Sequence, residues 1–247
     1  MAGVPIAGDE GAQRPTAGGD LVGSAPLGAL AAEALIQWDW IGRNLEAIWM
    51  RTQEHLILTA LPVLFGAVIA FPLALLAIRS PRLYSPLLGI TGVLFTIPSI
   101  AFFLLLGPFT GFLTRTTALV GLTIYTLLIL LRNTVEGLRG VPAEVREAAE
   151  AMGYRPTARL LRVELPLALP VIIAGLRIAT VTTVGLVPIT ALIAQGGYGQ
   201  FFIDGYLRAF ATPTIIGIVL STALAVAADL LLLRFQRALT PWARRAA

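Results

Sequence analysis

The 247-residue sequence contains no cysteine and no lysine, and its single histidine is His55. Without cysteine there is no disulfide framework, no thiolate metal site and no thiol nucleophile. One histidine is a poor basis for a metal site, which usually needs three or four converging ligands. We therefore expect no catalytic, cofactor or metal site in this chain.

Charge is also scarce, at 13% of residues, whereas hydrophobic residues make up 57% and the mean hydropathy is +0.82. Soluble domains average about 25% charged and roughly 45–50% apolar residues. The composition excludes a disordered chain and almost any soluble enzyme, and it predicts an integral membrane protein. The basic residues are all arginines that stand between apolar runs rather than on one face, so membrane topology explains them better than nucleic-acid binding.

A membrane-spanning helix needs about 20 mostly apolar residues. The candidate runs are 56–78, 83–114, 116–131, 165–203 and 209–228. The shortest run suffices when the flanking Arg115 and Arg132 extend their side chains outward. A sixth span would require the 165–203 run to be split at its glycines, a stretch more typical of a loop or a broken helix. We predict an all-α protein with five transmembrane helices.

The arginines also predict the orientation, because cytoplasmic segments carry an excess of them. If the first span runs inward, twelve arginines lie on the inner side and five on the outer side. The N-terminus is therefore expected outside and the C-terminus in the cytoplasm. The transmembrane domain is expected over residues 55–233, followed by a cytoplasmic tail, 234–247.

The N-terminal region is expected to have two parts. Residues 1–30 are rich in glycine, alanine and proline and are expected to be disordered. Residues 31–54 place Trp38, Trp40 and Trp49 among acidic residues, and tryptophan favours the headgroup zone. We interpret this segment as an interfacial amphipathic helix on the outer leaflet, with an ordinary helical linker as the alternative. His55 is then expected at the outer interface, with no catalytic role.

The longest hydrophilic stretch between spans is 132–164, on the cytoplasmic side. A short helix is predicted over 142–152, with Pro142 in its first turn and Gly153 as its stop. Alanines leave part of its surface small and flat beside Glu147 and Glu150. Composition alone leaves two interpretations open, a solvated connection between spans or a docking surface for another protein.

The spacing of this segment favours the second interpretation. Glu147-Ala148-Ala149, three residues, Gly153, nine residues and then Val163-x-Leu165-Pro166 resembles the EAA loop of ATP-binding-cassette importer permeases, with valine where that pattern usually has isoleucine. Further stretches resemble the glycine betaine/carnitine/choline permease subfamily. They are residues 54–59, 96–102, 131–134, 164–170 and 196–200.

This resemblance implies a type I importer permease and a set of partners. Two permease subunits, a second copy or a paralogue, would pair in the membrane lipid, each docking its loop into one of two cytoplasmic ATPase subunits. An extracytoplasmic binding protein would deliver a compatible solute. Glu147, Ala148, Ala149 and Gly153 carry over as ATPase-coupling positions. ATP would bind to the partner, since the chain has no Gly-x4-Gly-Lys-Ser/Thr phosphate loop.

Arg177 and Asp229 are the two formal charges within the spans, and such charges are costly unless paired or hydrated. At 1.5 Å per residue, their depths from the cytoplasmic side are about 10 Å and about 6 Å, which allows a salt bridge between the fourth and fifth spans. Alternatively, each reaches water separately. Gly196, Gly197 and Gly199 near the outer face are interpreted as an outer gate, or as an ordinary turn.

Other functions fit the residues less well. An importer for another small solute, such as an amino acid, would carry the same EAA loop. A membrane-embedded enzyme would need converging polar groups in its spans, and a secondary transporter usually shows two repeated halves. We find neither feature in the sequence, so we predict a permease of the cell membrane without an enzymatic site of its own.

Overall fold

The computed structural model describes residues 35–242, and residues 36–242 belong to one compact unit. The predicted disordered segment 1–30, the start of the predicted 31–54 helix and the end of the predicted tail lie outside the described residues. The described residues contain helices and no strand, as predicted. In chain order the helices are α2 (Trp38–Arg43), α3 (Leu45–Arg79), α4 (Pro81–Thr96), α5 (Ser99–Thr110), α6 (Arg115–Arg139), α7 (Ala143–Ala151), α8 (Pro156–Arg159), the π-helical η1 (Leu160–Glu164), α9 (Leu165–Leu186), the 3-10 helix η2 (Val187–Ile193), α10 (Gly199–Leu207) and α11 (Ala211–Leu239).

Four helical stretches are long and apolar enough to cross a membrane. They are α3, α6, the stretch from α8 through η2, and α11. Helices α4 and α5 form a fifth passage when the pair, bent by 105°, is counted as one broken span. Counted in this way, the described residues contain the five spans that the sequence predicts.

The bend between α4 and α5 falls inside the predicted span 83–114. Ile97 adopts an extended conformation because the ring of Pro98 disfavours helical geometry in the residue before it. The carbonyl of Ile97 lies outside both helices and accepts a hydrogen bond from the Tyr125 hydroxyl of α6, at 2.6 Å. The break therefore leaves this carbonyl satisfied.

Several predicted boundaries differ from those in the structure. Helix α6 continues through residues 132–139 of the predicted loop, and α11 continues past residue 228 to Leu239, because flanking charges end the apolar stretch without ending the helix. The predicted run 165–203 divides: η2 stops at Ala194, which has a left-handed φ of 62°, and α10 follows as a separate helix. The predicted helix 31–54 is also divided. Asn44, whose amide donates to the carbonyl of Trp40 at 2.8 Å, separates α2 from α3.

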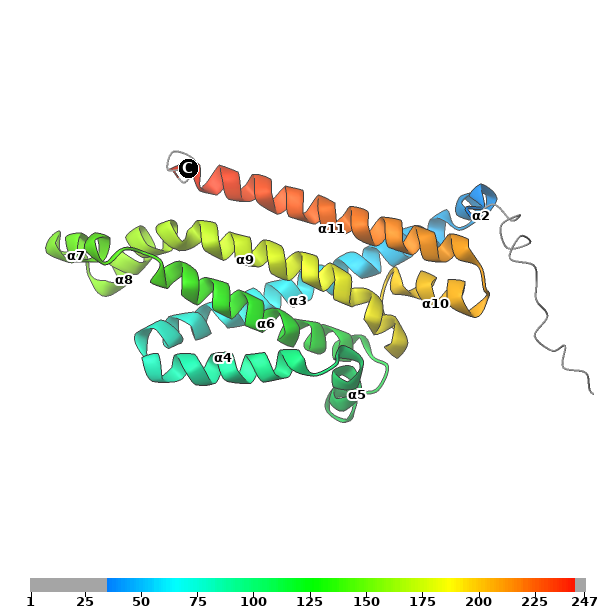
Figure 1. Cartoon of the computed structure of the whole chain (residues 1–247), viewed down its shortest axis with the longest axis horizontal. Coiled ribbons are helices and arrows are strands. Elements are labelled where there is room, and N and C mark those ends of the chain that lie inside the picture. The colour runs from blue at the N-terminus through cyan, green and yellow to red at the C-terminus, as the bar shows by residue number, and fades with distance from the viewer. Residues whose placement is uncertain (1–34, 243–247) are drawn as a thin grey trace, which may run out of the picture. The chain divides into compact units, whose positions relative to one another are not determined.

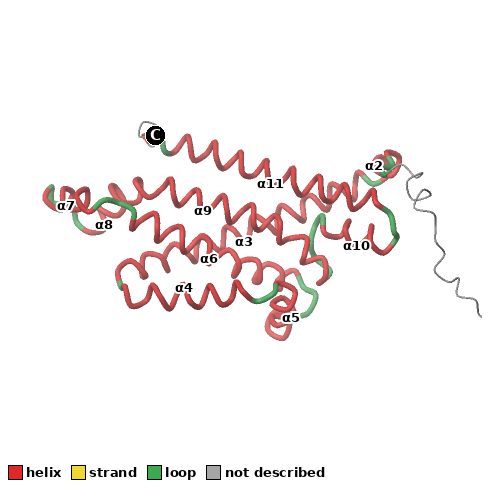
Figure 2. Tube along the Cα trace, in the orientation of Figure 1, coloured by secondary structure: helices red, strands yellow, loops and turns green. Residues whose placement is uncertain are grey.

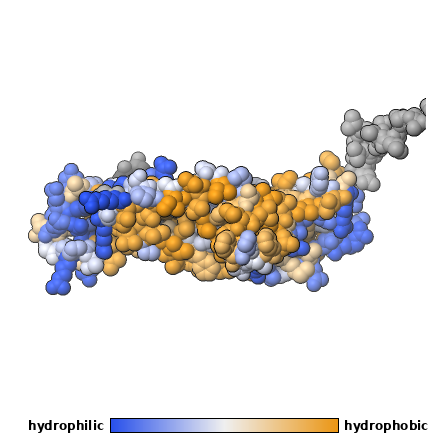
Figure 3. All heavy atoms as spheres, turned by 90° about the horizontal axis from the view of Figure 1, so that it is seen from below, coloured by the Kyte–Doolittle hydropathy of each residue, from blue (hydrophilic) through white to orange (hydrophobic). Residues whose placement is uncertain are grey.

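The connections gather at the two ends of the compact unit (Figure 2). Helices α7 and α8 lie at one end, and α2 and α10 lie at the other (Figure 1). On the face drawn in Figure 3, an apolar band crosses the middle and hydrophilic residues gather at both ends. This distribution is the one expected of a helix bundle that crosses a bilayer.

Helix α6 is the central helix of this unit. In the most apolar stretch of each helix, 56% of residues are buried in α6 and only 6% in α11. Helix α3 packs on α6 through small residues one turn apart, Gly66, Ala70 and Ala74, which let the two backbones approach closely. A Cβ atom at Gly66 would overlap the Thr126 hydroxyl, so this glycine sets the closeness of the contact.

Replacing Gly66 by alanine should therefore destabilise the bundle. Overpacking of this kind typically costs about 1–3 kcal/mol, so we expect a clear fall in the unfolding temperature of the purified permease in detergent. Gly89→Ala in α4 is the matched control, because a Cβ at Gly89 meets nothing within 4 Å. Equal unfolding temperatures for the two variants would contradict this account of the α3–α6 contact.

Candidate functional site

Helix α7 is a short helix with a capped C-terminus. It contains three of the predicted coupling positions, and the fourth, Gly153, follows its end. Pro142 precedes its first residue. At its other end Gly153 has a φ of +81°, and two backbone hydrogen bonds close the helix: Gly153 N–H to the carbonyl of Glu150 at 2.9 Å and Tyr154 N–H to the carbonyl of Ala149 at 3.1 Å. This is the Schellman arrangement, which satisfies carbonyls that would otherwise lack partners.

Two arginines fasten α7 to the long helices. Arg146 donates to the carbonyl of Leu138 at 2.7 Å and so joins α7 to the end of α6. Arg159 pairs with Glu150 of α7 and, at 2.6 Å, with Glu164 of η1, which leads directly into α9. Charged hydrogen bonds thus connect α7 to the end of α6 and, through Arg159, to the start of α9.

The predicted coupling residues divide between two faces of α7. Glu147, Ala148 and Gly153 are exposed, whereas Ala149 is only 1% exposed and faces the chain's own interior. Next to it, Val145 packs against the small core of Leu138, Val141 and Ala168. The structure therefore presents Glu147, Ala148 and Gly153 outward and uses Ala149 for packing.

The structure brings Arg177 of α9 and Asp229 of α11 together. The guanidinium donates from Nε to Oδ1 at 2.9 Å and from Nη2 to Oδ2 at 2.8 Å, a two-pronged ion pair. Gln236, two turns further along α11, donates to the carbonyl of Pro170 at 3.1 Å. These contacts join α9, from its first turns to just past its middle, to the second half of α11.

The three predicted gate glycines lie at the opposite end of the unit, in tight contact with other elements. Gly196 and Gly197 have φ values of +126° and +50°, which side chains rarely adopt. A Cβ at Gly197 would lie within 2.9 Å of the backbone of His55, and one at Gly199 would overlap the carbonyl of Pro188. Glycine is needed here because the loop lies directly against α3 and η2.

His55 is a residue whose role sequence reasoning missed. It is fully buried, accepts a hydrogen bond at Nδ1 from the Tyr198 N–H at 3.4 Å, and donates from Nε2 to the carbonyl of Val184 at 3.1 Å. One partner is a donor and the other an acceptor, so the ring is neutral with its proton on Nε2. His55 thereby ties α3 to α9 and to the loop of residues 194–198, which contains Gly196 and Gly197 and which we call the glycine loop. No sequence pattern signals this, because the partners lie 129 and 143 residues away.

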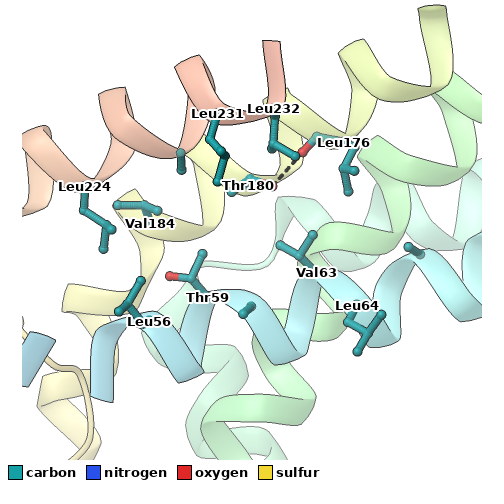
Figure 4. Close-up of a pocket in the computed structure, with 13 residues that line it drawn as sticks. Leu56, Thr59, Val63, Leu64, Leu176, Thr180, Val184, Leu224, Leu231 and Leu232 are labelled. Atoms are coloured by element: carbon teal, nitrogen blue, oxygen red, sulfur yellow. Dashed lines mark hydrogen bonds between the residues drawn. The ribbon is translucent and has the colours of Figure 1, made fainter. Parts of the chain in front are cut away.

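The groove in Figure 4 is largely apolar; its lining holds two hydroxyl groups, those of Thr59 and Thr180, and the Thr59 hydroxyl has no hydrogen-bond partner among the described residues. It has a volume of about 420 Å³ and lies between α3, α9 and α11. Leucine, valine and alanine dominate its lining, and the Thr180 hydroxyl donates to the carbonyl of Leu176 in its own helix. Within residues 35–242 no group of three His, Asp or Glu side chains converges in a way that could hold a metal ion.

Gly197→Ala should destabilise the protein more than Gly153→Ala. Both positions have a left-handed φ, which costs an L-residue roughly 1–2 kcal/mol, but only Gly197 also presses against backbone. Thermal unfolding of the two purified variants measures the difference. If Gly197→Ala is as stable as Gly153→Ala, the loop is not held against α3 as described.

The comparisons with known proteins agree with this architecture. Residues 62–241 match the family described as "Binding-protein-dependent transport system inner membrane component". The osmoprotectant import permease protein OsmW of Salmonella typhimurium is 38% identical over 194 residues, 77% of this chain and 90% of that protein. The choline transport system permease protein OpuBB of Bacillus subtilis is 34% identical over 77% of this chain and 88% of its own length.

A carnitine transport permease protein, OpuCB of Listeria monocytogenes, is 34% identical over 80% of this chain and 90% of its own length. Among solved structures, an inward-facing form of the MetNI methionine ABC transporter matches with a TM-score of 0.70 and 27% identity, covering 78% of this chain and 96% of that one. The family match includes α7 and every long helix from α6 onward. The chain therefore belongs to the family of binding-protein-dependent transport system inner membrane components and is a membrane permease of the ABC importer type.

Proposed function

We propose that this permease imports osmoprotectants, small solutes with a quaternary ammonium group such as glycine betaine, carnitine or choline. The observation that carries the substrate class is the group of relatives named for osmoprotectant, choline and carnitine transport, at 34–38% identity. An importer of an amino acid is the second candidate, and the structural similarity to a methionine transporter favours it.

In the proposed complex, ATP is hydrolysed by two cytoplasmic ATPase subunits, and a binding protein delivers the solute from outside. A second permease, either another copy or a paralogue, completes the membrane part. The exposed face of α7 docks into an ATPase subunit. Because Arg146 and Arg159 fasten α7 to α6 and η1, closure of the ATPases moves these helices and switches access between the two sides.

The proposed orientation places α7 in the cytoplasm and α2 outside. Trp38 and Trp49, at the end opposite α7, are 74% and 61% exposed, which suits the headgroup zone. The glycine loop at that end serves as the outer gate, with His55 as its anchor on α3. The loop suits a gate because one hydrogen bond, from the Tyr198 N–H to His55, and the backbone contact at Gly197 hold it against α3, and these can break together.

The absence of cysteine makes this topology directly testable. Met152, next to α7, is 69% exposed, and Tyr206, at the opposite end, is 84% exposed. We expect Met152→Cys to react with a membrane-impermeant maleimide only in inside-out vesicles and Tyr206→Cys only in intact spheroplasts, with the cysteine-free wild type as the blank. The opposite pattern would reverse the proposed orientation.

The coupling role is tested by ATP hydrolysis in the reconstituted complex. The binding protein is loaded in turn with glycine betaine, carnitine, choline, proline or methionine. We expect stimulation by the quaternary amines, and we expect Glu147→Arg to reduce it at least roughly tenfold, as the loss of a charged contact at an interface typically does.

Glu136→Gln is the matched control. Glu136 is a half-exposed carboxylate at the same end of the unit, and it pairs with Arg132 on its own helix. Stimulation by methionine alone would support the amino-acid importer. Unchanged coupling in Glu147→Arg would remove α7 from the ATPase contact.

A further inference from the structure

The Arg177–Asp229 pair is not sealed inside the helix bundle. The side chains remain 25% and 33% exposed, and both line a groove of about 580 Å³ between α9 and α11. The rest of this groove is largely apolar, with Ile178, Val181 and Val226 among its walls. We call it the charged groove, in contrast to the apolar groove of Figure 4, which α9 and α11 form together with α3.

The charged groove is not suited to lipid. A charge held in the hydrocarbon costs about 2.5–3.5 kcal/mol even on the more lenient scales, and charges inside spans commonly mark the path of a substrate or ion. Hydrocarbon can fill the apolar groove at little cost. The two grooves beside helices α9 and α11 are thus chemically different, and the charged groove is the one in which water or a polar solute is more stable than lipid.

The ion pair also has unused hydrogen-bonding capacity. A guanidinium has five N–H donors, and the contacts to Asp229 occupy only Nε and Nη2. Nη1 donates one of its two N–H groups to Gln236 Oε1 at 3.4 Å, which leaves the second N–H available. Each Asp229 oxygen accepts one hydrogen bond from Arg177, whereas a carboxylate can accept about four. A further anion can accept from the remaining N–H groups, and a further cation can lie against the partly exposed carboxylate by charge attraction, even without an N–H of its own, so neither needs to break the pair.

We propose that the charged groove is a transit site for zwitterionic quaternary ammonium carboxylates. The solute's carboxylate accepts hydrogen bonds from Arg177 Nη1, and its trimethylammonium group lies beside Asp229 and the apolar walls. Charges then alternate around the site, which offsets the loss of hydration of all four groups. This inference rests on the proposed function. It adds a difference between substrates that the proposed function alone does not predict: choline, which has no carboxylate, uses Asp229 and not Arg177.

The test compares solutes in the reconstituted complex. The readout is a ratio: the stimulation of ATP hydrolysis by binding protein loaded with glycine betaine, divided by the stimulation by binding protein loaded with choline. All variants use the same binding protein, so its own preference for one solute cancels when their ratios are compared. We expect Arg177→Gln to lower this ratio about tenfold, the effect of losing a hydrogen bond to a charged group. Thr180→Val, on the apolar groove of the same helix, is the matched control and should leave the ratio unchanged.

A second variant separates the transit site from a purely structural tie. The double exchange Arg177→Asp with Asp229→Arg keeps an ion pair between α9 and α11 but reverses its direction across the groove. We expect the unfolding temperature to recover toward the wild-type value relative to Arg177→Gln, while stimulation by glycine betaine stays at least about tenfold lower, again by the loss of charged contacts.

Two outcomes would overturn the transit site. Equal losses for glycine betaine and choline in Arg177→Gln would reduce the pair to a structural tie, as would full transport of both solutes by the double exchange. The wild-type complex tests the proposed function separately. If neither solute stimulates it, the osmoprotectant assignment fails before any variant is measured, and the transit site fails with it.

Discussion

The hydrocarbon of a bilayer offers no hydrogen-bond partners, and this constraint governs the whole described structure. Most departures from a straight apolar helix are matched by a partner elsewhere in the chain, and the buried hydroxyls of Thr59 and Ser221 are exceptions that have no hydrogen-bond partner among the described residues. The carbonyl of Ile97 at the α4–α5 break accepts a hydrogen bond from the Tyr125 hydroxyl, and Arg177 of α9 pairs with Asp229 of α11. Threonines such as Thr134 and Thr183 return their hydroxyls to carbonyls of their own helices. What stays polar and open is therefore a candidate for function.

Rigid and breakable contacts lie at opposite ends of the unit. Around α7, charged hydrogen bonds from Arg146 and Arg159 make a stiff attachment suited to transmitting force. At the other end, neutral hydrogen bonds of His55 and close backbone contact at Gly197 hold the loop. Helix α11, whose packing partners are mainly α9 and α10, links the two ends and borders both grooves. In the proposed function, the attachment around α7 is the lever and the glycine loop is the closure that opens.

Features set by interactions between neighbouring residues could be predicted from the sequence, and most features set by contacts between distant residues could not. Helix α7 was predictable because Pro142 and Gly153 act on their immediate neighbours. The inward face of Ala149 was not, since alanine is equally compatible with a docking surface and a core. Helices α6 and α11 are longer than the predicted apolar runs. Hydropathy indicates where the hydrocarbon ends, but a helix continues into water wherever its backbone hydrogen bonds continue.

The sequence by itself determined that this is an all-helical membrane protein, how many apolar passages it contains, and where its short capped helix lies, because composition, apolar length and caps act within one segment. It also indicated that Arg177 and Asp229 could meet. Only the tertiary structure decided that the pair opens on a groove, that His55 ties three elements together, and that the glycines lie against backbone. The ion pair, the His55 contacts and the Gly197 contact join residues more than fifty positions apart, whose proximity is set by how the helices pack.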